Sequence, residues 1–145
     1  MKKILIPKEF KNRIEEMIKE HSVIYLYAQI GWGKTNVVSE YLNREKIVFS
    51  SISAGKSDFS AQLRKLKGRI IVLDDFQDIL PENGEYLKEN FYELLREHRF
   101  IILSRSYMPS WLKPYQIIGQ LGILDREVLH IKVKEIKDFL EMHQI

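Results

Sequence analysis

The chain of 145 residues contains no cysteine. This absence excludes disulfide scaffolds, thiolate zinc sites and cysteine nucleophiles, and it fits the reducing cytoplasm, where we expect the protein to work. No apolar run approaches the ~20 residues that cross a bilayer, so the sequence predicts no membrane association. The apolar stretch after the first two lysines stops at Pro7, which is too early for a signal peptide.

An excess of charge of one sign is also absent. The 23 basic and 20 acidic residues are interspersed and leave a net charge of +3. This balance favours a solvated surface of mixed charge, with a nucleic-acid footprint as the alternative. Hydrophobic residues make up 45% of the chain and charged residues 30%, which excludes disorder and low complexity. The length predicts a single domain over residues 1–145.

Apolar periodicity predicts strands and helices in alternation. Continuous apolar strands between such helices predict an α/β fold, in which helices cover both faces of a mostly parallel sheet. The Asn83-Gly84 pair predicts a turn before the fourth helix. We expect the four histidines to bind no metal, and His21 and His98 to be exposed after helices. The expected helices span 8–20, 34–43, 57–66, 85–98 and 133–143. The expected strands span 23–27, 69–76 and 100–103, another strand begins at 47–49, and short strands are expected at 117–118 and 128–131.

The strongest functional signal is the segment AQIGWGKT at residues 28–35, which follows a predicted strand and opens a helix. Gly31 and Gly33 permit backbone angles that direct successive amides at an anion, and the helix N-terminus adds its own free N–H groups. Lys34 supplies a positive charge between the β- and γ-phosphates. Thr35 supplies a hydroxyl for magnesium. The pattern predicts a phosphate-binding loop for ATP or ADP with Mg²⁺.

Three neighbouring positions complete this predicted loop. Ala28 replaces the first glycine of the usual GxxxxGK[ST] pattern, which an alanine at a strand end tolerates if φ stays negative. Trp32 contributes its backbone, and Asn36 follows Thr35 at the start of the helix. A chance Gly-x-Gly-Lys-Thr turn is the alternative interpretation.

Two aspartates end the apolar run IIVL. Ligands bind at the carboxyl ends of strands in open α/β sheets, so Asp74 and Asp75 lie where a ligand is expected. Asp74 could hold magnesium beside Thr35, and Asp75 could orient or activate the attacking water. The alternative is an ordinary aspartate-rich turn after a strand.

Arg105 follows the apolar run FIIL, at the carboxyl end of another predicted strand. Its planar guanidinium suits phosphate oxygens, so we predict that it reaches the terminal phosphate. A surface arginine on a loop is the alternative.

The order of these motifs resembles the ATP-binding domain of the large LuxR-type transcriptional regulators, the maltose-activator group of the STAND class of signalling ATPases. Loops in that family read like APAGYGKT, against AQIGWGKT here; acidic strands read like LVLDDY, against IVLDDF; and arginine strands read like LASRTDPP, against ILSRSYMP. The stretch 119–140 is similar to the family's passage into its helical subdomain. The resemblance covers nearly the whole chain.

The resemblance implies a P-loop NTPase fold and assigns roles to the matching residues. Lys34 and Thr35 would bind nucleotide and magnesium, Asp74 and Asp75 would form the acidic pair, and Arg105 would sense the terminal phosphate. Pro7 would lie near the adenine, with Lys8 where the family often has arginine. Family members switch between a resting ADP form and an ATP form that self-associates, and they bind DNA through another domain.

We therefore expect residues 1–145 to be the N-terminal, nucleotide-binding piece of a longer regulator, with the remaining domains as partners and with slow ATP hydrolysis. The alternative is a P-loop enzyme proper, either an AAA+-type ATPase or a small nucleotide kinase. A kinase needs a basic lid, and the candidate segment 106–114 carries only Lys113. A third possibility, a binding module that has lost nucleotide, conflicts with the intact Lys34, Thr35, Asp74 and Arg105.

Overall fold

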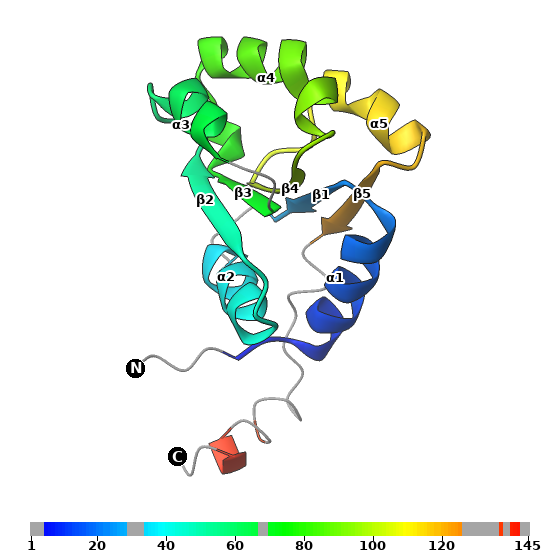
Figure 1. Cartoon of the computed structure of the whole chain (residues 1–145). Coiled ribbons are helices and arrows are strands. Elements are labelled where there is room, and N and C mark those ends of the chain that lie inside the picture. Colours follow the sequence, from blue (N-terminus) through cyan, green and yellow to red (C-terminus); the bar gives the residue numbers. More distant parts are fainter. Residues whose placement is uncertain (1–4, 29–33, 67–69, 126–136, 138–139, 143–145) are drawn as a thin grey trace.

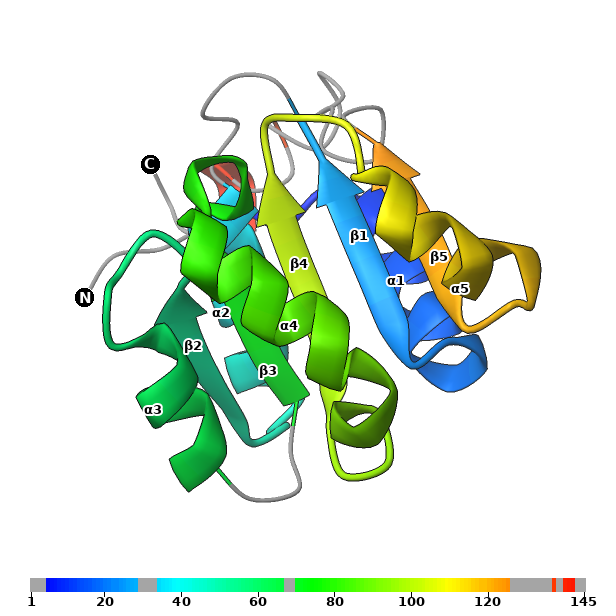
Figure 2. The same cartoon turned by 90° about the horizontal axis from the view of Figure 1, so that it is seen from above.

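The computed structural model describes residues 5–28, 34–66, 70–125, 137 and 140–142. Five of the described segments form one sheet of parallel strands in the order β2-β3-β4-β1-β5 (Figures 1 and 2). The strands are β1 (Val23–Tyr27), β2 (Phe49–Ser53), β3 (Ile70–Asp74), β4 (Arg99–Ser104) and β5 (Leu121–Asp125). The helices are α1 (Lys8–Glu20), α2 (Lys34–Arg44), α3 (Phe59–Lys65), α4 (Pro81–Leu94) and α5 (Lys113–Ile117), with short 3₁₀ turns η1 (Phe76–Asp78) and η2 (Ser110–Leu112).

Helices cover both faces of the sheet, so the predicted three-layer arrangement is confirmed. Helices α1 and α2 pack on one face, and α3, α4 and α5 pack on the other (Figure 1). Side chains along β1 alternate between the two cores: Ile24 and Leu26 face α1 and α2, whereas Val23 and Tyr25 face the other helices. A strand that is buried on both faces needs apolar residues at every position, which explains the continuous run VIYLY.

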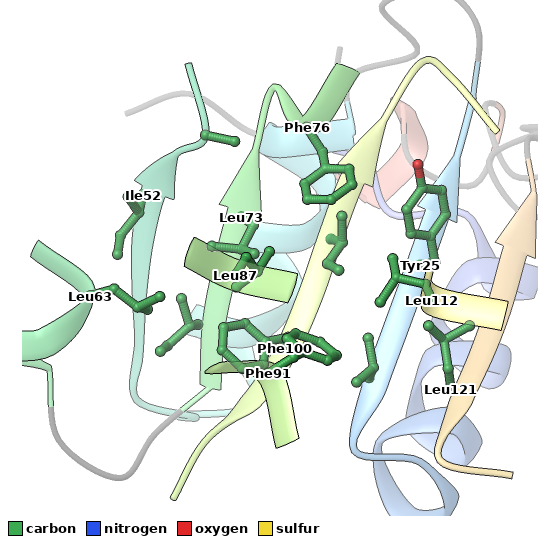
Figure 3. Close-up of a cluster of buried hydrophobic side chains, with 14 of the residues drawn as sticks. Tyr25, Ile52, Leu63, Leu73, Phe76, Leu87, Phe91, Phe100, Leu112 and Leu121 are labelled. Carbon is green, nitrogen blue, oxygen red and sulfur yellow. The ribbon is translucent and has the colours of Figure 1, made fainter. Parts of the chain in front are cut away.

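The core on the α3–α5 face is rich in aromatic rings (Figure 3). Phe91 of α4 lies at its centre, with ring centroids 5.3 Å from Phe100, 5.3 Å from Trp111 and 5.1 Å from Tyr115. Aromatic pairs at such distances contribute roughly 0.5–1.5 kcal/mol each beyond the burial of their area. These contacts attach η2 and α5 to α4, which in turn packs on Phe100 of β4.

The predicted turn at Asn83-Gly84 is wrong, because α4 begins earlier, at Pro81. Proline at the first helical position has its φ preset for a helix and loses no helical hydrogen bond. The Asn83 side chain is buried, and its Nδ2 donates to the carbonyl oxygens of Ala54 at 2.9 Å and Lys56 at 2.8 Å. Asn83 therefore provides hydrogen bonds to two backbone carbonyl groups of the loop after β2 and does not form a turn.

The predicted strand at 117–118 is also wrong. Ile117 ends α5, Ile118 follows it, and the two side chains are 75% and 68% exposed. Gly119 then turns the chain with a φ of +82°, and the strand that we did not predict, β5, pairs in parallel with β1. Its run Leu-Gly-Ile-Leu is short and contains Gly122, which weakened the strand pattern in the sequence.

Other predicted elements differ less. Helix α1 and strand β1 have the predicted bounds, and β2 begins at Phe49, the last residue of its predicted start. His98 was expected to be exposed but is buried, with its ring against Phe100. The predicted strand at 128–131 and most of the predicted helix at 133–143 lie outside the described residues.

Candidate nucleotide-binding site

Because all five strands are parallel, their carboxyl ends meet at one edge of the sheet. Strand β4 lies between β1 and β3, so three of the predicted functional segments come from three neighbouring strands. Neighbouring strands lie about 4.8 Å apart, so the ends of β1 and β3 are separated by roughly 10 Å with the end of β4 between them. The register pairs Tyr27 with Ser104, Ser53 with Asp74 and Leu73 with Ile102, so the four strand ends lie within one residue of the same level.

The predicted phosphate-binding loop has the predicted flanks. It leaves β1 after Tyr27, and helix α2 begins at Lys34. Ala28 is buried, and its N–H donates to the carbonyl oxygen of Ser104 at 3.0 Å, which fixes the start of the loop beside β4. Residues 29–33, including Gly31, Trp32 and Gly33, lie outside the described residues, as do the side chains of Lys34, Thr35 and Asn36.

The two aspartates after β3 have different settings. Asp74 is the last residue of the strand, is partly exposed, and accepts the N–H of Asp75 on Oδ1 at 2.9 Å. Asp75 was predicted to continue the strand, but it has φ 54° and ψ 39°, the left-handed conformation that aspartate tolerates better than most residues. Its Oδ2 accepts a hydrogen bond from Ser53 Oγ of β2 at 3.4 Å. The Asp75 carboxylate therefore contacts the β2 side of β3, whereas β1 lies on the other side.

Arg105 lies in the turn that follows β4, and it is exposed. Its N–H donates to Gln77 Oε1 at 3.0 Å. The next residue is held twice: Ser106 N–H donates to Ser104 Oγ at 3.0 Å, and Tyr25 OH donates to the Ser106 carbonyl oxygen at 2.8 Å. Three side chains thus fix the backbone on which Arg105 is carried.

Ser53, Gln77 and Tyr25 also contribute to this edge, and the sequence did not predict these contacts. Ser53 and Gln77 lie 22 and 28 residues from their partners, and Tyr25 lies 81 residues from its own. No pattern within a short stretch of the sequence indicates contacts between residues so far apart. The one available signal was the position of Ser53 and Gln77 at or just after the end of a predicted strand.

Pro7 and Lys8 belong to the same end of the molecule. Helix α1 and strand β1 are separated by only His21 and Ser22, so they run in opposite directions. The start of α1 therefore lies toward the carboxyl edge of the sheet (Figure 2). Pro7 is buried at the N-cap of α1, and Lys8 is exposed.

The magnesium prediction concerns Thr35 and Asp74. Within the part of the chain that the structure describes, no three metal-ligating side chains of the His, Cys, Asp and Glu types lie together. Mg²⁺ does not need such a cluster, because it is commonly held by one or two protein oxygens, phosphate oxygens and water. A carboxylate at the end of β3 and a hydroxyl at the start of α2 fit this ligand set.

The sequence matches no known family model and no curated protein. Solved structures do match. The Holliday junction branch migration motor RuvB of Thermotoga maritima superposes with a TM-score of 0.60 at 15% identity, over 94% of this chain and 52% of that one. A Walker-type ATPase of Pyrococcus abyssi superposes with a TM-score of 0.59 at 12% identity, over 98% of this chain and 59% of that one.

The chain has the P-loop NTPase fold. It spans between half and three fifths of the length of these two structures, and at these identities the likeness is one of fold. Among the residues described, no helix is long and apolar enough to cross a membrane.

Proposed function

We propose that this chain binds adenine nucleotide with Mg²⁺ and acts as the ATP/ADP switch of a LuxR-type transcriptional regulator, with slow hydrolysis. The observation that carries the proposal is the strand order. It brings the Arg105 turn between the start of the phosphate-binding loop at Ala28 and the acidic end of β3 at Asp74. A terminal phosphate held by the loop would therefore lie close to both a carboxylate and an arginine.

In the proposed site, the loop amides and Lys34 hold the β- and γ-phosphates, and the N-terminus of α2 adds its dipole. Thr35 and Asp74 would hold Mg²⁺, which would supply positive charge to offset that of the phosphates. Arg105 contacts the terminal phosphate and so distinguishes ATP from ADP. Pro7 and Lys8 line the adenine side.

The proposal assigns to Asp75 the orientation of the attacking water. Its carboxylate contacts Ser53 of β2, on the side of β3 away from β1. Asp74 is the last residue of the strand itself. The left-handed conformation of Asp75 after a buried strand is of a kind that clusters at functional sites, which supports this role.

The alternative is an ATPase that performs work or a nucleotide kinase. The kinase alternative needs a lid, and the candidate segment 106–114 is anchored in the core by Met108 and Leu112, which are 5% and 0% exposed. The AAA+-type alternative comes from the sequence pattern, and the branch migration motor RuvB that this chain matches shares with it only the fold.

The partners follow from the same proposal. The remaining domains of the regulator would dock on this one, ATP would favour self-association, and DNA would be bound through a domain that is not in this sequence. The cytoplasm is the proposed location.

The test is calorimetric titration of ATP and ADP, with Mg²⁺, into the wild type and Lys34→Ala. A charge-assisted hydrogen bond contributes about 1.5–3 kcal/mol, so the affinity for both nucleotides should fall roughly tenfold to a hundredfold. Lys88→Ala, at an exposed position of α4, is the matched control and should bind as the wild type does. Equal ATP affinity in Lys34→Ala would refute the proposed phosphate site.

A further inference from the structure

One side chain joins the acidic loop after β3 to the turn after β4. Gln77 is the middle residue of η1, the turn that follows the left-handed Asp75. Its side-chain Oε1 accepts a hydrogen bond from the N–H of Arg105 at 3.0 Å. The same amide donates from Nε2 to Asp78 Oδ2 at 3.2 Å. These two contacts fix the amide in one orientation, because the reverse would set an N–H against an N–H and an oxygen against a carboxylate.

Gln77 is held firmly on the acidic side of this link. The N–H of Asp78 donates to the carbonyl oxygen of Asp75 at 2.9 Å, which ties η1 to the left-handed residue. Phe76 is buried, and its ring meets that of Tyr25 edge-on, with centroids 6.0 Å apart (Figure 3). A shift of the Asp75 backbone therefore carries Gln77 with it.

The other side of the link is the backbone of Arg105 itself. The Arg105 amide points at Gln77, so the direction in which the arginine leaves β4 depends on that acceptor. Without it, this N–H would lose its protein partner and the turn could relax. The acidic loop after β3 and the turn that carries Arg105 are thus joined by this hydrogen bond beyond the end of the β3–β4 pairing.

We propose that Gln77 is a positioning residue that keeps the Arg105 turn aligned with the Asp74–Asp75 loop, and that it sets the preference for ATP over ADP. This inference rests on the proposed function. Gln77 acts through Arg105 and needs no contact with nucleotide. Substitution of Gln77 should therefore change the affinity for ATP, which carries the terminal phosphate, and leave the affinity for ADP unchanged.

The experiment is a double-mutant cycle read by calorimetry with ATP and with ADP, in the presence of Mg²⁺. Gln77→Met keeps the length and volume of the side chain but removes the oxygen acceptor. We expect it to weaken ATP binding about three- to tenfold, the usual net effect of one hydrogen bond, and to leave ADP binding unchanged. Arg105→Ala should weaken ATP binding more, and adding Gln77→Met to it should change the ATP-to-ADP ratio no further.

Gln62→Met is the matched control, since Gln62 makes a comparable side-chain hydrogen bond to Asp58, at the start of α3. It should keep the wild-type ratio. Gln77→Ala is the second variant, and urea unfolding of each protein shows whether it is folded before the titration.

Three results would overturn the inference. The first is a wild-type ATP-to-ADP ratio in both Gln77 variants, the second is equal weakening of both ligands, and the third is a further change when Gln77→Met is added to Arg105→Ala. Failure of the proposed function is distinct, because the wild type would then bind neither nucleotide. That result would overturn both proposals.

Discussion

The hydroxyl of Tyr25, whose ring is buried in the core, donates a hydrogen bond to the carbonyl oxygen of Ser106 at 2.8 Å. The ring packs among the side chains of the α3–α5 face, and the hydroxyl points along β1 toward the carboxyl edge (Figure 3). Burial raises the pKa of Tyr25, although the hydroxyl of Ser104 opposes this effect. The core of the sheet thereby fixes the turn that carries Arg105.

Removing this hydroxyl gives the first prediction. Tyr25→Phe should lower the free energy of unfolding by about 0.5–1.5 kcal/mol, since one net hydrogen bond is lost while the ring stays packed. Urea unfolding measures the change. Tyr92→Phe is the control, because Tyr92 is 68% exposed and should lose almost nothing. A loss of the same size in both variants would mean that the Ser106 contact contributes no stability.

Two glycines offer a matched pair for the second prediction. A Cβ at Gly122 of β5 would lie 2.6 Å from Met17 Sδ and 2.7 Å from His21 Cδ2, so Gly122→Ala must displace α1 side chains. Overpacking of this kind costs about 1–3 kcal/mol. Gly84 of α4 has open space around its Cβ position, so Gly84→Ala should stabilise the protein by roughly 0.5–1 kcal/mol through helix propensity. Thermal unfolding of both variants gives the signs, and a stable Gly122→Ala protein would contradict the close approach of α1 to β5.

The third prediction concerns the dependence of the folding stability on pH. His98 is buried, and its Nδ1 has no hydrogen-bond partner among the residues that the structure describes. Burial lowers the pKa of His98 below the ordinary value of 6.5, and Glu97, 3.9 Å away, acts in the opposite direction. His98 is then protonated near pH 6.5 in the unfolded chain but stays neutral at that pH in the folded chain. The stability due to neutral His98 is complete above about pH 6.5 and is lost as the pH falls toward the lower, folded pKa.

His98→Leu tests this relationship. The free energy of unfolding of the wild type should fall more steeply between about pH 7 and 5 than that of the variant, which has no proton to take up there. Urea titrations at several pH values measure both slopes. Parallel slopes would show that His98 has the same pKa in the folded and unfolded chains.

The fourth prediction concerns turnover. An arginine donated from outside the site accelerates phosphoryl transfer on the order of a thousandfold or more, and a regulator would receive such help only from its other domains or from a partner. The chain alone should therefore hydrolyse ATP far more slowly than the ~1–100 per second typical of kinases. A phosphate-release assay, with and without a small phosphate acceptor, measures this rate. Turnover in the kinase range would favour the enzyme alternative over the switch.

Much of the fold followed from patterns within single segments. The apolar face of α1 repeats at Phe10, Ile14 and Met17, and all three residues are buried as that spacing requires. Strand β4 has an unbroken apolar run because helices cover it on both faces. Where the local signal was ambiguous, the prediction was wrong. Asn83 looked like a turn residue, but its side chain serves the carbonyl groups of a loop 27 to 29 residues earlier.

The sequence by itself determined the alternation of helices and strands and the chemistry available at the strand ends: a phosphate-loop lysine, two aspartates and an arginine. These features depend on neighbours within a few residues, so periodicity and composition are enough to read them. The order of the strands, the fifth strand and the contacts of Gln77 and Tyr25 were decided only by the tertiary structure. Parallel strands are joined through helices, so a strand need not pair with the next strand in the sequence. Only the packing of both cores therefore decides which strand ends lie side by side. That packing placed β4 between β1 and β3, and with it Arg105 between the loop and Asp74.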